Sequence, residues 1–116
     1  MRILVAEDEF LVGIQLEEDL RSLGCSIVGP FTTLEMATQA ARHERFDLAI
    51  LDINLNGTMV YPLADELAQR GVPFIFLSGY MVADLPDRFR EAPQIAKPHD
   101  PAVLTKAIRK AAPKAD

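Results

Sequence analysis

The chain has 116 residues, of which 49% are hydrophobic and 25% charged, a composition typical of one globular domain with a single core. Its net charge of −5 argues against nucleic acid as a direct partner, because no basic stripe is available to neutralise phosphates. The only cysteine, Cys25, excludes an internal disulfide and a multi-cysteine metal site, and is typical of a reduced, cytoplasmic protein. We expect no signal peptide, no membrane-spanning segment and no membrane partner.

Short apolar runs bounded by charged or turn residues predict buried β-strands. They occupy residues 3–6, 25–28, 48–51, 72–77 and 94–96. The second of these strands is expected to stop at Gly29-Pro30, and the third to be followed directly by a turn, Asn-Leu-Asn-Gly.

Apolar residues at helical spacing predict a helix after most of these strands. The first helix ends at Gly24 and carries Val12, Leu16, Leu20 and Leu23. The second begins with the capping-box pattern of Thr32 and Glu35 and runs to about His43, with an inward face of Met36, Ala37, Ala40 and Ala41.

The remaining helical segments are unequal in strength. A third helix begins near Pro62 and ends at Gly71. Between residues 81 and 93 the pattern allows only a short helix of two turns. Asp100 caps a last helix, whose core face carries Val103, Leu104, Ala107, Ile108 and Ala111. Residues 113–116 are expected to form a loose tail.

Strands that alternate with helices five times predict one α/β domain over residues 1–116, a flavodoxin-like (βα)5 doubly wound parallel sheet with strand order 2-1-3-4-5. In that order the first and third strands are neighbours. The carboxylates that follow them, Glu7, Asp8 and Asp52, are therefore expected to converge at the carboxyl edge of the sheet.

Three convergent carboxylates repel one another unless a cation lies among them, and oxygen ligands alone suit Mg²⁺, with Mn²⁺ as a substitute. The fourth strand ends in a hydroxyl, Ser78, and the fifth in an ammonium, Lys97. A divalent cation, a hydroxyl and a lysine around Asp52 would stabilise phosphoryl charge, with Asp52 as the nucleophile. His43 and His99 have no metal-ligand spacing and are interpreted as exposed, and the methionines as core residues.

Each of these residues has a simpler interpretation when taken alone. Asp52 could cap a turn, and Glu7-Asp8-Glu9 could be acid favoured at a helix N-terminus. Ser78-Gly79 could be a plain turn and Lys97-Pro98 a plain loop. Four features, each at the end of its own strand, favour a common site over four coincidences.

With Glu7-Asp8, Asp52, Ser78 and Lys97-Pro98 in this order at the ends of its strands, the chain resembles a response-regulator receiver domain over essentially its whole length. The resemblance implies that Asp52 accepts a phosphoryl group from a sensor histidine kinase. It implies that Asp8, Asp52 and the backbone carbonyl of Asn54 bind Mg²⁺, with Glu7 acting mainly through water. It further implies phosphoryl contacts or switch roles for Ser78, Gly79 and Lys97, and a cis Lys97-Pro98 bond.

The chain departs from the typical receiver in two places. No Met-Pro follows Asp52, and Gln94 stands where an aromatic switch residue is usual. The run PFIFLSGY at 73–80 is similar to the motif of the single-domain receivers called FATGUY, which are partners of HWE/HisKA2 kinases of α-proteobacteria. We expect Tyr80 or the segment 81–93 to carry the signal in place of the aromatic residue.

Several alternatives remain open. A pseudo-receiver would use the same fold as a binding module without phosphorylation. A haloacid-dehalogenase-like phosphatase would need a second Asp where Asn54 stands, and a flavodoxin-type carrier would need a phosphate loop where Glu7-Asp8-Glu9 stands.

We expect no enzyme activity beyond self-phosphorylation and dephosphorylation, and no output domain. Signalling would proceed by contact with an unknown downstream protein, with the last two helices as the usual interaction face, or the chain would act as a phosphate sink. Whether the chain is part of a larger protein stays open.

Overall fold

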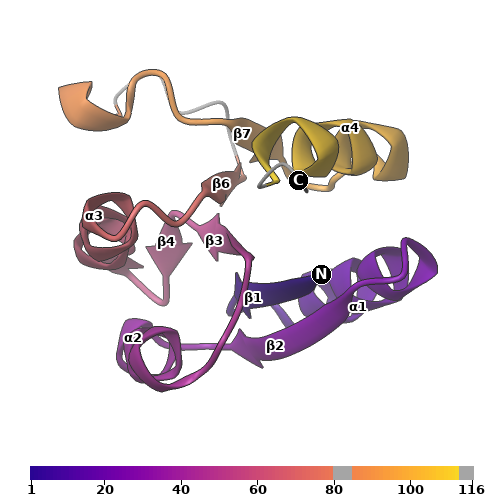
Figure 1. The fold of residues 1–116 in the computed structure, drawn as a ribbon, viewed down its shortest axis with the longest axis horizontal. Helices are drawn as coiled ribbons and strands as arrows, with labels where there is room; N and C mark the ends of the chain where they lie inside the picture. The colour runs from indigo at the N-terminus through magenta and orange to yellow at the C-terminus, as the bar shows by residue number, and fades with distance from the viewer. Residues whose placement is uncertain (80–84, 113–116) are drawn as a thin grey trace.

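The computed structural model describes residues 1–79 and 85–112. Its central feature is a five-stranded parallel sheet with the strand order β2-β1-β3-β6-β7, whose strands lie edge to edge in Figure 1. The strands are β1 (Arg2–Ala6), β2 (Ser26–Phe31), β3 (Leu48–Asp52), β6 (Phe74–Ser78) and β7 (Gln94–Ala96). Because β6 and β7 are the fourth and fifth strands of this sheet along the chain, the predicted flavodoxin-like order 2-1-3-4-5 is confirmed.

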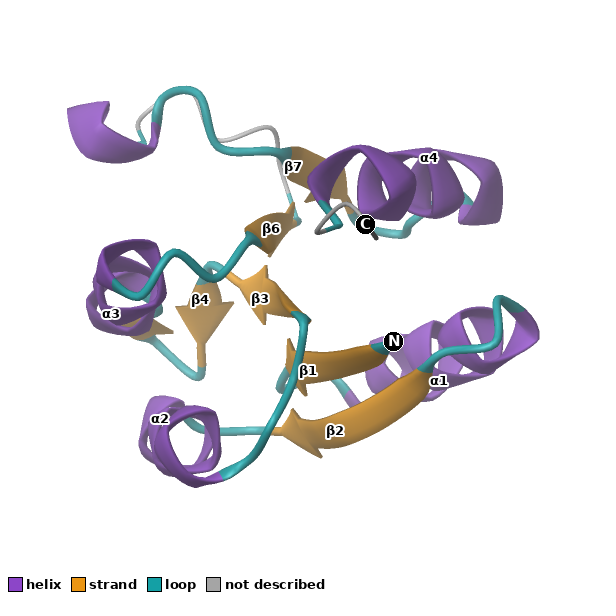
Figure 2. Cartoon of the chain, in the orientation of Figure 1, coloured by secondary structure: helices purple, strands orange, loops and turns teal. Residues whose placement is uncertain are grey.

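Helices cover both faces of the sheet, as Figure 2 shows. They are α1 (Phe10–Ser22), α2 (Leu34–His43), α3 (Tyr61–Gln69) and α4 (Pro101–Ala111). Leu16 and Leu20 of α1 pack with Leu104 and Ile108 of α4 on one face, whereas α2 and α3 pack on the other. Every residue of β3 is buried, because this central strand has helices above and below it. Within the described ranges, no helix combines the length and apolarity needed to cross a bilayer.

Two predicted helix ends are confirmed, and one predicted start is wrong. Gly24 and Gly71 have φ of 83° and 70°, the left-handed conformation that closes a helix without a Cβ clash. The N-cap of α2 is Thr33, not Thr32: Thr33 is extended, and its Oγ1 accepts from the backbone N–H of Met36 at 3.1 Å. The predicted capping box is therefore wrong, because the third helical position after Thr33 is Met36 and not Glu35.

Three methionines and one valine were expected in the core but are exposed. Met36 is 52% exposed, because the buried stripe of α2 consists of three small residues, Ala37, Ala40 and Ala41. Met1 and Met59 are exposed as well, and on α4 Val103 is 49% exposed beside the buried Leu104. Met36 and Val103 lie at the margins of the apolar stripes of their helices, where the surrounding packing decides their burial.

The second strand is longer than predicted. It continues through a cis Gly29-Pro30 peptide bond to Phe31, whose carbonyl accepts from the backbone N–H of Glu7 at 2.9 Å. Gly29 has φ of 111°, and a Cβ there would lie 2.7 Å from the carbonyl oxygen of Val5. Glycine is therefore required where β2 approaches the end of β1.

The turn after Asp52 is a small β-hairpin, which the sequence pattern had not indicated. Its strands are β4 (Asn54–Leu55) and β5 (Thr58–Met59), which pair antiparallel. Asn56 and Gly57 have φ of 52° and 88°, which is the requirement of a two-residue hairpin turn.

The short helix predicted between residues 81 and 93 is a single 3-10 turn, η1 (Asp87–Phe89), in the part that the structure describes. Phe89 is buried against the rings of Tyr61, Phe74 and Phe76, with centroid distances of 5.4 to 5.9 Å. One buried aromatic side chain thus anchors this segment to the core.

Candidate functional site

Asp52 is the last residue of β3 and lies at the carboxyl edge of the sheet, nearly fully buried. Its Oδ1 accepts from the backbone N–H of Asn54 at 3.3 Å, and its Oδ2 accepts from Nζ of Lys97 at 3.1 Å. A buried carboxylate at the end of a central strand is held rigidly and is reached only from this edge, the usual location of ligand chemistry in α/β sheets.

The structure brings Glu7, Asp8 and Asp52 together, as the strand order requires. Each offers one carboxylate oxygen, and these oxygens all lie within 4.8 Å of one another. Glu7 and Asp8 follow β1, the neighbour of β3 in the sheet. An all-oxygen set of this size and charge fits a hard divalent cation such as Mg²⁺.

Lys97 supplies the positive charge of the site. Its side chain is 10% exposed, and Nζ donates to both oxygens of Glu7 at 3.3 Å and to Oε1 of Glu9 at 3.0 Å, besides Asp52. Its backbone N–H donates to the carbonyl of Ser78 at 2.7 Å, and the Lys97-Pro98 bond is cis. The role of Glu9 was not recognised from sequence, where an acid at a helix N-terminus was the only signal.

Burial and neighbouring charges shift the pKa values of the carboxyl groups in this cluster. The pKa of Glu7 is raised to about 7, because burial and the negative charge of Asp52 outweigh the hydrogen bond from the backbone N–H of Glu9 and the charge of Lys97. Burial also raises the pKa of Asp52, and the nearby Asp8 carboxyl adds to the rise. Burial would raise the pKa of Asp8 too, but its hydrogen-bonding neighbours outweigh that effect and lower it. Because the pKa of Glu7 lies near neutrality, a cation that binds here competes with a proton on this carboxyl.

The same surroundings favour the charged form of Lys97. Burial disfavours its charged form, but hydrogen bonds to Glu9 and Asp52 and the charges of Asp52 and Glu7 outweigh burial, so its pKa lies well above the ordinary value. The ammonium is therefore a permanent charge at any physiological pH.

The other predicted site residues lie around this cluster. Ser78 ends β6 and is buried, and its Oγ has no hydrogen-bond partner within the described residues. A Cβ built on Gly79 would meet no atom within 4 Å in that part of the chain. The backbone N–H of Asn54 donates to Oδ1 of Asp52. That the backbone carbonyl of Asn54 binds a metal ion stays a prediction. Tyr80 lies outside the described residues.

His99 corrects the expectation of an exposed side chain. Only 2% of its side chain is exposed, and its Nε2 lies 2.5 Å from Oδ2 of Asp19 on α1. His43, at the end of α2, is exposed as expected.

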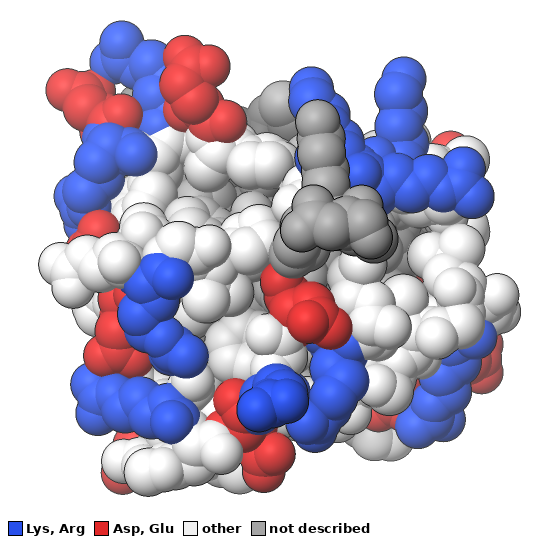
Figure 3. All heavy atoms as spheres, viewed as in Figure 1, with Lys and Arg blue, Asp and Glu red and all other residues white. Residues whose placement is uncertain are grey.

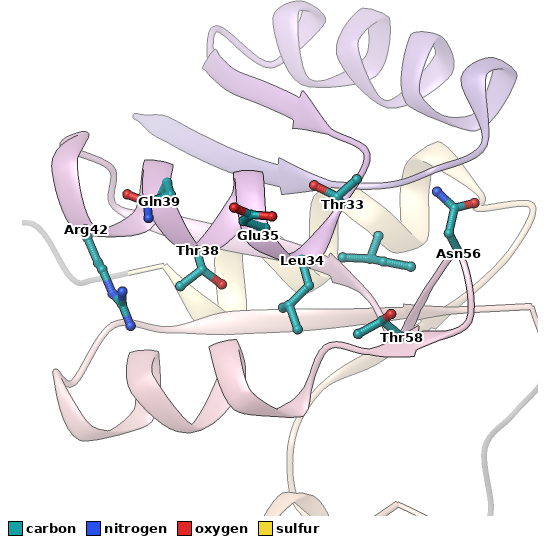
Figure 4. A pocket seen from close by; sticks show the side chains of 9 residues that line it. Thr33, Leu34, Glu35, Thr38, Gln39, Arg42, Asn56 and Thr58 are labelled. Atoms are coloured by element: carbon teal, nitrogen blue, oxygen red, sulfur yellow. The ribbon is translucent and has the colours of Figure 1, made fainter.

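A groove of about 530 Å³ lies apart from the carboxylates, between α2 and the β4–β5 hairpin (Figure 4). Its lining is mainly hydroxyl, amide and aliphatic, and its cation, Arg42, is paired with Glu66 at 2.7 Å. Asn56, which lines this groove, is also bonded to the acidic cluster, because its backbone N–H donates to Oδ2 of Asp8 at 3.0 Å. The groove has no convergent titratable groups, so the chemistry belongs to the carboxylate edge.

The chain is similar to known response regulators. Residues 3–109 match the family model of the response regulator receiver domain. The chain is 33% identical over 111 residues to the transcriptional regulatory protein PdtaR of Mycobacterium tuberculosis, a match that covers 92% of this chain and 54% of PdtaR. The chain thus spans about half the length of this curated relative.

Solved structures agree with the family. The solution structure of SdrG from Sphingomonas melonis Fr1 has a TM-score of 0.85 and 35% identity, covering 94% of this chain and 93% of SdrG. The BeF3-activated conformation of SdrG from Pseudomonas melonis Fr1 has a TM-score of 0.80 and 36% identity, covering 93% and 92%. With the acidic cluster, Asp52 and Lys97 at one sheet edge, the chain belongs to the response regulator receiver domain family.

Proposed function

We propose that the chain is a phosphoacceptor receiver that takes a phosphoryl group onto Asp52. One observation carries this proposal: the buried Asp52 carboxylate lies 3.1 Å from Lys97 Nζ and within 4.8 Å of two further carboxylates. A nucleophile, a permanent cation and a cation-binding acid pair at one point match the requirements of phosphoryl transfer.

Glu7, Asp8 and Asp52 would hold Mg²⁺, with the carbonyl of Asn54 as a further ligand. Bound there, Mg²⁺ would neutralise charge on the phosphoryl oxygens. A carboxylate oxygen of Asp52 forms the new bond to phosphorus as the bond from phosphorus to the donor's histidine nitrogen breaks. The Lys97 ammonium offsets the negative charge that arrives, and the unpaired hydroxyl of Ser78 can donate to a phosphoryl oxygen.

SdrG, a relative of similar length, supports this proposal, because one of its structures is described as a BeF3-activated conformation. The chain's own donor would be a sensor histidine kinase of the HWE/HisKA2 class in the cytoplasm, and its signal would pass to a protein partner. Phe10 and Leu11 are each 78% exposed and follow the acidic loop directly, so they offer this kinase an apolar contact beside Asp52.

Incubation with acetyl phosphate, with and without Mg²⁺, tests the proposal by intact mass. We expect a Mg²⁺-dependent gain of one phosphoryl group that Asp52→Ala abolishes. Asp47→Ala is the matched control: it removes another carboxylate next to β3, one that accepts from the backbone N–H of Arg2, and it should be phosphorylated like the natural chain. No gain in a folded protein that binds Mg²⁺, with a histidine kinase as well as with acetyl phosphate, would instead identify a pseudo-receiver.

A further inference from the structure

The loop between β7 and α4 is attached to α1 by a buried pair of side chains, His99 and Asp19. The imidazole is almost fully buried, and the Asp19 side chain is 17% exposed. Because a carboxylate can only accept, Nε2 of His99 carries the proton and donates to Asp19. Oδ1 of Asp19 accepts a second bond, from Nε2 of Gln15 at 3.1 Å, so the carboxylate is oriented from within α1.

This pair lies next to the residue on which the site depends. The loop has only four residues, 97 to 100, and three of them have a defined anchor. Lys97 is tied to β6 through its backbone N–H, and Asp100 caps α4 by accepting from the N–H of Ala102 at 2.8 Å. His99 is the anchor between them, and it is the one that reaches α1.

The two elements that this pair joins carry the opposite charges of the site. The acids Glu7, Asp8 and Glu9 lead into α1, whereas Lys97 leads into α4. Buried leucines of the two helices already pack together, but apolar packing does not define the direction of a loop. A buried, charge-assisted hydrogen bond does, because it is directional and because breaking it removes the partner that the structure gives to a buried imidazole nitrogen.

We propose that His99 and Asp19 are positioning residues that hold the Lys97 loop against α1 and so keep Nζ of Lys97 among the carboxylates. Neither residue touches the reacting atoms. The pair acts on the site through the direction in which the loop presents Lys97.

Acylation of lysines by an amine-reactive acetyl ester, read by peptide mass spectrometry, tests this without any phosphoryl chemistry. Lys106 and Lys110 on α4 are exposed and serve as references within the same chain; Figure 3 shows basic side chains gathered over α4. We expect His99→Leu to raise the acylation rate of Lys97 by about tenfold while the two reference rates stay constant. His99→Gln, whose amide nitrogen can take the place of Nε2, should restore much of the protection.

Asp19→Ala removes the same hydrogen bond by changing its other partner, whose side chain is more exposed than that of His99. This variant therefore still tests the proposal if His99→Leu folds poorly. It should raise the Lys97 rate as His99→Leu does, and the double variant should add little more. Arg42→Gln removes an exposed ion pair with Glu66 on the other face of the sheet. It should leave the acylation rates of all three lysines unchanged. An unchanged Lys97 rate in both single variants, or an equal rise at all three lysines, would overturn the proposal.

A second readout rests on the proposed function. His99→Leu and Asp19→Ala should slow phosphorylation by acetyl phosphate by about tenfold without lowering Mg²⁺ affinity, because the proposed metal ligands lie outside residues 97–100 and a displaced Lys97 leaves their negative charge in place. An equal loss of Mg²⁺ affinity would contradict a role through Lys97. If the natural chain accepts no phosphoryl group, the proposed function fails, whereas the acylation result still decides the role of His99.

Discussion

Nζ of Lys97 lies 3.1 Å from Oδ2 of Asp52, although 45 residues separate the two in sequence. The same ammonium also contacts Glu7 and Glu9, and Asp8 lies within the same cluster. One cation therefore faces four carboxyl groups. The charge balance is negative, and together with burial it raises the pKa values of Glu7 and Asp52, so stability and metal binding should depend on pH.

We expect Glu7→Gln to stabilise the metal-free protein at pH 8. The pKa of Glu7 is raised from 4.5 to about 7, so its contribution to stability is full below pH 4.5 and is lost as pH rises through 7. Glutamine resembles the protonated acid at every pH. The variant should gain at most about 3 kcal/mol in free energy of unfolding at pH 8 and close to nothing at pH 4.5.

Denaturant unfolding at the two pH values measures this difference. Glu18→Gln removes an exposed acid from α1 and should shift the free energy of unfolding by less than about 0.5 kcal/mol at both. A gain from Glu7→Gln that is equal at pH 4.5 and pH 8 would show that the ionisation of Glu7 is not its cause.

Binding of Mg²⁺ should release a proton below pH 7. The raised pKa values of Glu7 and Asp52 mean that the cation competes with a proton, so the affinity should rise by up to about tenfold per pH unit and level off above pH 7. Titration calorimetry in two buffers of different ionisation enthalpy counts the protons. We expect close to one at pH 6 and close to none at pH 8.5, and no release at pH 6 would refute the linkage.

Ser78→Ala should separate stability from phosphoryl chemistry. The buried Oγ has no partner within the described residues, so its removal should leave the free energy of unfolding unchanged or raise it by about 1 kcal/mol. Phosphorylation by acetyl phosphate should slow by about tenfold, because one donor to the phosphoryl group is lost. Ser78→Thr retains the hydroxyl and should stay active; destabilisation by Ser78→Ala would indicate a hidden partner for Oγ.

Replacing Phe10 and Leu11 by serine should slow phosphorylation by the histidine kinase but not by acetyl phosphate. These exposed side chains directly follow Glu9 in the sequence and carry no charged or hydrogen-bonding group. Transfer from a phosphorylated HWE/HisKA2 kinase should fall by about tenfold, whereas the rate with acetyl phosphate stays constant. Equal rates with the kinase would place its docking surface elsewhere.

The sequence was sufficient for the sheet and for the place of the chemistry. Buried strands that alternate with helices predict a doubly wound sheet, and the flavodoxin-like order, which the structure confirms, places the ends of β1 and β3 side by side. The meeting of Glu7, Asp8 and Asp52 follows from this topology alone. Local signals were equally reliable where backbone geometry dictates the residue, as for Gly24, Gly71 and the Asp100 cap.

Other features depended on packing that no local pattern describes. Two adjacent threonines could each cap α2, and the extension of β2 to Phe31 accompanies the choice of Thr33. Whether Met36 and Val103 are buried depends on which neighbours cover the margins of their helices.

The sequence by itself thus determined the α/β fold, the order of its strands and the edge at which Asp52 and Lys97 lie. Only the tertiary structure decided that Lys97 also contacts Glu9, that Asn56 donates to Asp8 and that His99 is buried against Asp19. The partners in these contacts are 88, 48 and 80 residues apart. Strand and helix periodicities report which face of an element is buried, whereas a contact between two polar side chains depends on the final packing of separate elements.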